Sequence, residues 1–207
     1  DAVYPSTIVG VPPQEDAWLG KATERIFLAP IKMTVVPEII DMEMPIEGVF
    51  HNLTIVKIEK SFSGHAQKVM NAMWGAGQMM LNKILVVVDQ HVDIHSYSEV
   101  AQAISKNVDP QQDIYFSQGP MDVLDHSCSK FAFGGKMGID ATTKTPEELR
   151  SDNINSLNFE LPDESKIKIL FNEITAVNLN LLKLNISCAI VGVKKSKPNH
   201  IKQLADQ

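Results

Sequence analysis

The stretch KILVVVDQHVDI, residues 83–94, decides the fold class of this chain. Its first part is a nearly continuous apolar run rich in Val, and acidic residues follow directly. Such a run is typical of a strand buried on both faces, because a strand with one solvated face alternates apolar and polar residues. Helices on both sides of a sheet provide that burial, so the stretch predicts a layered α/β fold.

Segments of helix and strand character alternate on both sides of this run. Residues 37–60 are rich in Ile and Val and are interrupted by turn residues, so they predict strands. Residues 61–77 carry an apolar stripe at helical spacing, with Ser63 as a predicted N-cap. Residues 96–108 predict a short helix, and residues 113–118 predict another strand. The alternation indicates an α/β domain with a mixed sheet flanked by helices.

Residues 15–28, EDAWLGKATERIFL, contain Gly-Lys-Ala-Thr, which superficially matches a phosphate-binding loop. The match fails because G-x-x-x-x-G-K-[ST] needs a glycine and a hydroxyl where this chain has Glu15 and Ala22. Apolar residues instead recur at helical spacing behind an acidic first turn, which suits the helix dipole. The stretch therefore predicts an amphipathic helix that ends near Pro30.

The composition provides enough apolar residues for a core and no strong charge. The 207 residues are 44% hydrophobic and carry a formal net charge of −6, which argues against nucleic acid or an anionic membrane as the main partner. No apolar run reaches the length of a transmembrane helix. Cys128 and Cys188 stand far apart, and isolated thiols indicate a reducing, cytoplasmic setting.

The chain begins with DAVYPSTIVG, residues 1–10, and has no initiator Met. The stretch predicts a strand that runs into a turn at Gly10. A chain that begins within a strand is expected to be a piece of a longer polypeptide. Tag removal and natural processing are the alternatives.

The alternation of helix and strand stops at residues 119–145. A connection of this length is expected to be functional or mobile. Its glycine-rich part, FGGKMG, carries Lys136, which could hold a phosphate group or belong to a flexible lid. After a polar linker, residues 151–207 predict a helix and a strand, followed by a short basic tail.

Four potential metal ligands alternate in DQHVDIH: Asp89, His91, Asp93 and His95. On an extended strand they would share one face. Neighbouring side chains on that face lie about 6.5–7 Å apart, too far for all four to reach one ion, and metal sites usually take ligands from more than one element. A solvated, acidic strand end is the preferred interpretation.

Other histidine, cysteine and glycine residues give weaker signals. His65 at a helix start could hold an anion, although a solvated residue is the preferred interpretation. His126 and Cys128 could form a nucleophilic pair, but neighbours in sequence rarely face each other, so a small hydrolase is a remote hypothesis. Gly75 or Gly77 either ends a helix or lets a ligand approach the backbone.

Four stretches resemble, in the same order, the UbiD family of non-oxidative decarboxylases, in particular the 4-hydroxy-3-polyprenylbenzoate decarboxylase-like enzymes of quinone biosynthesis. They are YPSTIVGVPPQEDAWLGKATERIFLAPIKM (4–33), PEIIDMEMPIEGVFHNL (37–53), VMNAMWGAGQMM (69–80) and GPMDVLDHSCSKFAFGGKMGIDATTKTPEE (119–148). Four unrelated motifs in one order make the resemblance specific. The residues after Arg150 are less distinctive.

The resemblance implies a carboxy-lyase that removes CO2 from an aromatic or unsaturated acid, such as a polyprenyl-hydroxybenzoate or another ubiquinone or menaquinone precursor. UbiD-type enzymes use prenylated FMN with a divalent metal, and a flavin prenyltransferase supplies the cofactor. They assemble as homo-oligomers, either dimers or hexamers, largely through their C-terminal part. No nucleic-acid partner is implied, and the expected location is cytoplasmic or membrane-peripheral.

On this resemblance the chain is the C-terminal portion of such an enzyme. Residues 1–33 would be the end of the central flavin-binding region with a connecting helix. Residues 34–150 would be the C-terminal α/β domain, with an active-site loop at 119–145. Residues 151–207 would be a helix–strand extension. The family's catalytic Glu-Arg-Glu network and metal ligands are expected upstream, so no catalytic or metal-binding residue is assigned here, and the chain alone is expected to be inactive and to hold no cofactor.

The resemblance also assigns residues of a substrate and cofactor pocket. The turn at the start of the first helix would approach the flavin and the substrate through Glu15, Asp16 and Leu19. The stretch GAGQMM would lie near the flavin phosphate, with Gly77 and Gln78 as cofactor-binding residues.

A third stretch, GPMDVLDH, resembles the loop that closes over the substrate. Met121 and Leu124 would form its apolar gate, which suits a hydrophobic aromatic acid. The alternative to a catalytic parent is a stand-alone oligomerisation or binding module that keeps the fold without the chemistry. A native gene product of only this length would indicate that alternative.

Overall fold

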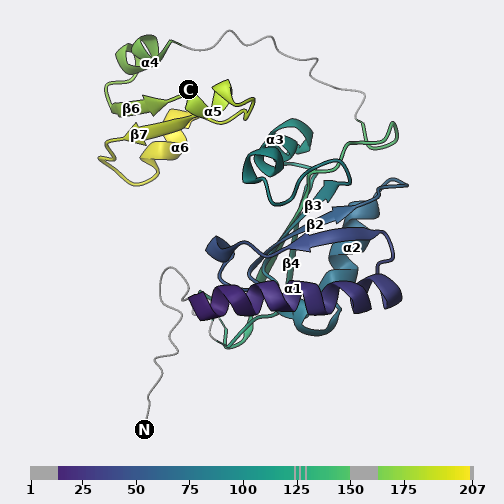
Figure 1. The fold of residues 1–207 in the computed structure, drawn as a ribbon. Coiled ribbons are helices and arrows are strands. Elements are labelled where there is room, and N and C mark those ends of the chain that lie inside the picture. The colour runs from purple at the N-terminus through teal and green to yellow at the C-terminus, as the bar shows by residue number, and fades with distance from the viewer. Residues whose placement is uncertain (1–13, 124, 126, 129, 150–162, 206–207) are drawn as a thin grey trace. The chain divides into compact units, whose positions relative to one another are not determined.

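The computed structural model describes residues 14–123, 125, 127–128, 130–149 and 163–205, with side chains for the same residues except 14–17, 164, 168 and 170. The chain divides into two compact units, residues 1–150 and residues 151–207, drawn in Figure 1. The strand expected at residues 1–10 lies outside the described residues.

Unit 1 is built on a five-stranded mixed sheet. In spatial order its strands are β1 (Ile39–Glu43), β2 (Leu53–Ile58), β3 (Ile84–Asp89), β5 (Phe133–Asp140) and β4 (Ile114–Pro120). The inner strands β2, β3 and β5 are parallel, whereas β1 and β4 pair antiparallel at the two edges. The mixed sheet confirms the predicted α/β class.

The central strand β3 is buried on both faces, as its apolar run predicted. Leu85 and Val87 belong to the core on one face. Val86 and Val88 belong to the core on the other face. Successive side chains of a strand point to opposite sides, so a strand between two cores needs apolar residues at every position.

Helices supply the outer layers of these two cores (Figure 1). The helices α1 (Gln14–Thr34) and α2 (His65–Trp74) and the short 3-10 helix η2 (Gly77–Leu81) cover the first core. The helix α3 (Tyr97–Asn107) covers the second. Another 3-10 helix, η1 (Ile46–Gly48), joins β1 to β2.

Strand β5 corrects the prediction of an unbroken loop at residues 119–145. Residues 133–140 pair with β3 on one side and β4 on the other. Glycines obscured this strand because they have low strand propensity. Gly138 is required by close packing, since a Cβ there would lie 2.4 Å from Met70 Sδ. The glycine at position 138 therefore reflects the close approach of the β5 backbone to α2, which a sequence pattern of polarity does not reveal.

Two predicted helix boundaries were wrong. The helix α1 continues through Pro30 to Thr34. Pro30 leaves the carbonyl group of Ile26 without its N–H partner, and both residues are exposed, Ile26 to 65%. The N-cap of α2 is Gly64, with φ of 76°, and not Ser63. The Ser63 hydroxyl instead lies 2.7 Å from Thr145 Oγ1.

Unit 2 contains more elements than the predicted helix and strand. They are α4 (Glu164–Leu170), β6 (Ile174–Asn178), α5 (Asn180–Lys183), β7 (Ile190–Val193) and α6 (His200–Ala205). The strands β6 and β7 pair antiparallel. Across the described parts of both units, no helix is long and apolar enough to cross a membrane.

A buried asparagine connects the elements at one end of the unit 1 sheet. Asn82 Nδ2 lies 2.8 Å from the carbonyl oxygen of His51, 3.0 Å from Thr54 Oγ1 and 3.0 Å from the carbonyl oxygen of Ile84. Its Oδ1 accepts a hydrogen bond of 3.1 Å from Trp74 Nε1. The side chain therefore joins the starts of β2 and β3 to the end of α2.

We predict that Asn82→Ala lowers the free energy of unfolding by about 2–4 kcal/mol, because several buried partners lose their hydrogen bonds at once. The control is Asn71→Ala, at an exposed position of α2. Urea denaturation of the two variants measures the difference. A loss of stability at Asn82 no larger than at Asn71 would contradict the prediction.

Candidate functional site

One edge of the unit 1 sheet gathers most of the candidate residues. The parallel strands β2, β3 and β5 all begin at this edge, and the antiparallel β4 ends there. Residues 50–53, η2 and the connection between β4 and β5 therefore meet there. We call this region the site edge, and we call the connection, residues 121–132, the 121–132 segment.

A buried histidine faces the 121–132 segment. His51 is 2% exposed, and its Nε2 lies 3.4 Å from Asp122 Oδ2. Within the described residues, neither ring nitrogen makes a hydrogen bond. Burial lowers the pKa of His51, although the Asp122 charge opposes that effect. The imidazole is therefore held in its neutral form near neutral pH.

An ion pair attaches the 121–132 segment to the start of β3. Lys83 Nζ lies 2.6 Å from Asp125 Oδ2 and also contacts the hydroxyl of Ser127. Asp125 Oδ1 accepts hydrogen bonds from the backbone N–H and the hydroxyl of Ser127, at 2.9 and 2.6 Å. Burial raises the pKa of Asp125, but the hydrogen bonds from Lys83 and Ser127 outweigh it and lower that pKa to about 2.

Lys136 fits neither function that the sequence left open for it. It lies on β5 and is 3% exposed, so it is not part of a flexible lid. Its Nζ donates to the carbonyl oxygens of Met80 and Asn82, at 2.6 and 2.7 Å. Burial lowers its pKa to about 8. The ammonium group thus fastens the end of η2 to the sheet instead of presenting itself to a phosphate.

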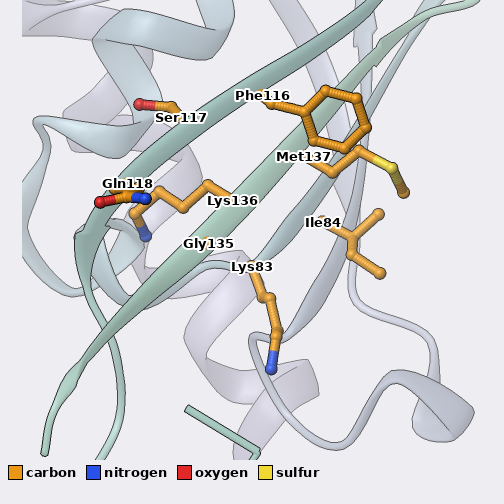
Figure 2. A pocket seen from close by; sticks show the side chains of 8 residues that line it. All are labelled: Lys83, Ile84, Phe116, Ser117, Gln118, Gly135, Lys136 and Met137. Atoms are coloured by element: carbon orange, nitrogen blue, oxygen red, sulfur yellow. The ribbon is translucent and has the colours of Figure 1, made fainter. Parts of the chain in front are cut away.

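A hollow of about 420 Å³ opens on the sheet next to the site edge. It is lined by Lys83, Ile84, Phe116, Ser117, Gln118, Gly135, Lys136 and Met137. Figure 2 shows Phe116, Met137 and Ile84 grouped on one side, with Gln118 and Lys136 on the other. An apolar wall beside a few polar groups is the usual composition of a site for an organic ligand.

Three pocket residues predicted from the resemblance lie near this edge. Gly77 and Gln78 begin η2, and Gly77 has a φ of 50°, a conformation that favours glycine. Met121 is 2% exposed at the start of the 121–132 segment, where its N–H donates to the carbonyl oxygen of Ala132 at 3.0 Å. Their assignment to a cofactor and a substrate remains a prediction.

The other predicted pocket residues are placed only in part. Leu19 lies on α1 and is 54% exposed. The neighbouring Gly20 packs on Phe50, since a Cβ there would lie 3.5 Å from the Phe50 ring. This contact brings the beginning of α1 close to the site edge. The side chains of Glu15 and Asp16, and all of Leu124, lie outside the described residues.

The alternating acids and histidines after β3 do not share a strand face. The strand ends at Asp89, whose Oδ2 accepts hydrogen bonds from the N–H and hydroxyl of Thr143, at 2.7 and 2.6 Å. His95 turns toward Glu43, with Nδ1 2.9 Å from Oε2. Among the described residues, no group of three potential ligands could hold a metal ion.

The prediction that His65 is a solvated residue was wrong. Its side chain is fully buried, stacked on Phe62 with ring centroids 4.1 Å apart. Its Nε2 lies 3.0 Å from Glu38 Oε1 and its Nδ1 accepts from the Ser61 N–H at 3.1 Å. These contacts explain the residue as part of the α2 start rather than as an anion site.

The remote hypothesis of a catalytic thiol gains no support. Burial and the Asp125 carboxylate raise the pKa of Cys128, which disfavours the reactive thiolate. His126, its proposed base, lies outside the described residues.

The sequence analysis missed the ionisable residues of the site edge, namely His51, Lys83, Asp122 and Asp125. They stand at strand ends or in the connection between strands, where a charged residue usually faces solvent. One available signal was that parallel strands begin at the same edge of a sheet. Residues that precede β2, β3 and β5 were therefore bound to meet.

Comparison with known proteins identifies relatives of this chain. Residues 17–141 match the family described as "3-octaprenyl-4-hydroxybenzoate carboxy-lyase C-terminal domain". The chain is 46% identical over 174 residues to an uncharacterised protein of Archaeoglobus fulgidus, covering 83% of this chain and 36% of the relative. It is 52% identical over 148 residues to one of Aquifex aeolicus, covering 72% and 30%. The chain thus spans about a third of the length of these curated relatives.

Solved structures show the same fold. The UbiD-class enzyme HmfF of Pelotomaculum thermopropionicum, in complex with FMN, matches with a TM-score of 0.54 and 26% identity, over 73% of this chain and 32% of the enzyme. Vanillic acid decarboxylase of Sedimentibacter hydroxybenzoicus, in open form, matches with a TM-score of 0.53 and 29% identity, over 68% and 31%. In both cases this chain corresponds to about a third of the longer protein.

We predict that Asp125→Asn speeds hydrogen exchange of amides in the 121–132 segment several-fold at neutral pH, because it weakens the attachment to Lys83. In the wild type, the stabilisation by the carboxylate is complete above about pH 4 and is lost as the pH falls toward 2, since folding lowers the pKa to about 2. The control is Asp93→Asn, at an exposed carboxylate beyond the opposite end of β3. Equal exchange rates of these amides in the two variants would contradict the conclusion that the pair of Lys83 and Asp125 attaches the segment.

We predict that the buried Lys136 makes stability rise with pH between about 8 and 10.4. Its pKa is about 8 in the folded state and about 10.4 in an unfolded chain, so the unfolded state binds more protons in this range. Urea denaturation of wild type and Lys136→Met should therefore diverge as the pH increases. The exposed Lys106→Met controls for loss of a positive charge. Parallel pH profiles for wild type and Lys136→Met would contradict the burial of a charged group.

Proposed function

Because this chain belongs to the UbiD family, as a 3-octaprenyl-4-hydroxybenzoate carboxy-lyase C-terminal domain, we propose that it is the C-terminal part of a decarboxylase dependent on prenylated FMN. The observation that carries the proposal is the family match over nearly all of unit 1. Such an enzyme removes CO2 from an aromatic or unsaturated acid. By itself, the chain is inactive, and the parent polypeptide supplies the catalytic carboxylates.

The length of the relatives supports a catalytic centre that is completed outside this chain. The chain spans only about a third of them, and the buried polar groups of the site edge are mostly occupied by one another. Lys83 is paired with Asp125, and Lys136 with backbone carbonyl groups. Such groups shape and attach a wall of a pocket. They do not form a nucleophile with its base.

The residues of the site edge fit contact with one side of a bound flavin. Gly77 has no Cβ and adopts a φ of 50°, which lets a ligand approach the backbone, and the Gln78 amide can donate a hydrogen bond. When bound, prenylated FMN supplies the electron sink for loss of CO2. The divalent metal of the family is assigned to ligands elsewhere in the parent polypeptide.

In this proposal, the 121–132 segment covers the substrate and excludes water. Met121 anchors its start in the core, and the pair of Lys83 and Asp125 attaches its middle. The apolar character of Met121 and the predicted gate residue Leu124 favours a hydrophobic aromatic acid. A polyprenyl-hydroxybenzoate or a related ubiquinone or menaquinone precursor is the substrate class that we propose.

Partners follow from the same proposal. The HmfF enzyme was solved in complex with FMN, and the parent of this chain would receive prenylated FMN from a flavin prenyltransferase. The parent would assemble as a homo-oligomer, either a dimer or a hexamer.

The first experiment is the intact mass of the polypeptide from the native gene, followed by a CO2-release assay on that polypeptide with prenylated FMN. We predict a mass well above 22.9 kDa and release of CO2 from a hydrophobic aromatic acid. Unmodified FMN is the control and should give no turnover. A mass equal to this chain would overturn the proposal and support an oligomerisation or binding module.

We predict that Met121→Ala in the active parent lowers kcat/KM about tenfold, a loss of about 1.4 kcal/mol of transition-state stabilisation. Met121 is buried at the beginning of the segment, whereas Val123 in the same segment is 59% exposed. Val123→Ala is therefore the matched control and should change kcat/KM less than twofold. Equal effects of the two variants would exclude a specific function of Met121.

A further inference from the structure

One long face of α1 carries apolar side chains that the described residues of unit 1 do not cover. Trp18 is 73% exposed, Ile26 is 65% exposed and Met33 is 84% exposed. Ala22 and Ala29 are exposed as well. The five positions are separated by four, four, three and four residues, so they lie on one side of the helix. We call these five residues the α1 stripe.

The contacts on the opposite side of α1 prevent the stripe from turning into the core of unit 1. Glu24 is 3% exposed, and its Oε2 accepts a 2.7 Å hydrogen bond from the N–H of Met44. Arg25 Nη1 lies 2.8 Å from Asp41 Oδ1. Ile31 is buried in the core beneath the sheet. These contacts fix the rotation of α1 about its axis. One apolar face packs on the core of unit 1, and the α1 stripe points away from it.

An apolar stripe about 22 Å long, at a rise of 1.5 Å per residue, is unusual on the free surface of a protein and marks an interaction site. Large and small side chains alternate along it, which creates ridges and gaps at the spacing of a packed helix. The two alanines allow the partner backbone to approach closely. The stripe therefore fits an apolar face of another α-helix.

We propose that the α1 stripe packs against a helix from the remainder of the parent polypeptide; this inference rests on the proposed function. The relatives are about three times as long as this chain, which covers 36% and 30% of two of them. Residues 17–141 match a C-terminal domain, so the remainder of such a parent would precede this chain. A partner helix from that remainder would belong to the same molecule.

Oxidation of Met33 to its sulfoxide by hydrogen peroxide tests the proposal, because the rate depends on access to the sulfur. In the 207-residue chain, where this side chain is 84% exposed, Met33 should react at a rate close to that of an added methionine peptide. In the parent polypeptide, the reaction should be at least about tenfold slower. Peptide mass spectrometry measures both rates. A parent rate within twofold of the rate in this chain would overturn the proposal.

Two variants of the parent separate packing from other causes of protection. Ile26→Asp introduces a charge into the stripe and should restore the oxidation of Met33. Ile169→Asp, at an isoleucine of α4 that is 78% exposed and outside the stripe, should leave Met33 protected. Protection that disappears on dilution of the parent would assign the stripe to a second copy and overturn the proposal.

The CO2-release assay on the same preparation separates this inference from the proposed function. An active parent with a reactive Met33 would overturn the inference and leave the function intact. An inactive parent with a protected Met33 would overturn the function and support the packing of the stripe.

Discussion

The hydrogen bonds of the Asn82 side chain are the constraint on which the site edge depends. This buried amide joins the end of α2 to the starts of β2 and β3. The backbone carbonyl group of Asn82 also accepts a hydrogen bond from the buried Lys136 ammonium group of β5. Buried polar groups lose much stability when they are left without partners. Three strands, a helix and η2 are therefore fixed relative to one another at a single residue.

The two sides of the site edge are held by different physical forces. The sheet side is held by apolar burial around β3 and by the Asn82 network. The 121–132 segment is attached by the ion pair of Lys83 with Asp125, and the neutral His51 ring faces Asp122. A segment held by a few polar contacts opens at lower free energy than a segment buried in a core. That difference suits a wall that admits a substrate and then covers it, as the proposed function requires.

Sequence reasoning succeeded where a side-chain pattern maps directly onto burial. The run at residues 83–94 predicted a doubly buried strand, and β3 lies between two cores. It failed for β5, because Gly134, Gly135 and Gly138 carry no pattern of polarity. For Lys136 and His65, it could not tell a buried polar side chain from an exposed one, because the partners lie on other elements.

The sequence by itself determined the layered α/β class, the central strand and the family, because periodicity and ordered motifs are local properties of the chain. Only the tertiary structure decided which residues form the site edge. His51, Lys83 and Asp125 are distant in sequence and become neighbours because parallel strands begin at one edge of the sheet. It also decided that the second face of α1 stays uncovered by the described residues of unit 1. The hydrogen bonds that α1 makes with Asp41 on β1 and with Met44 after it fix the rotation of that helix.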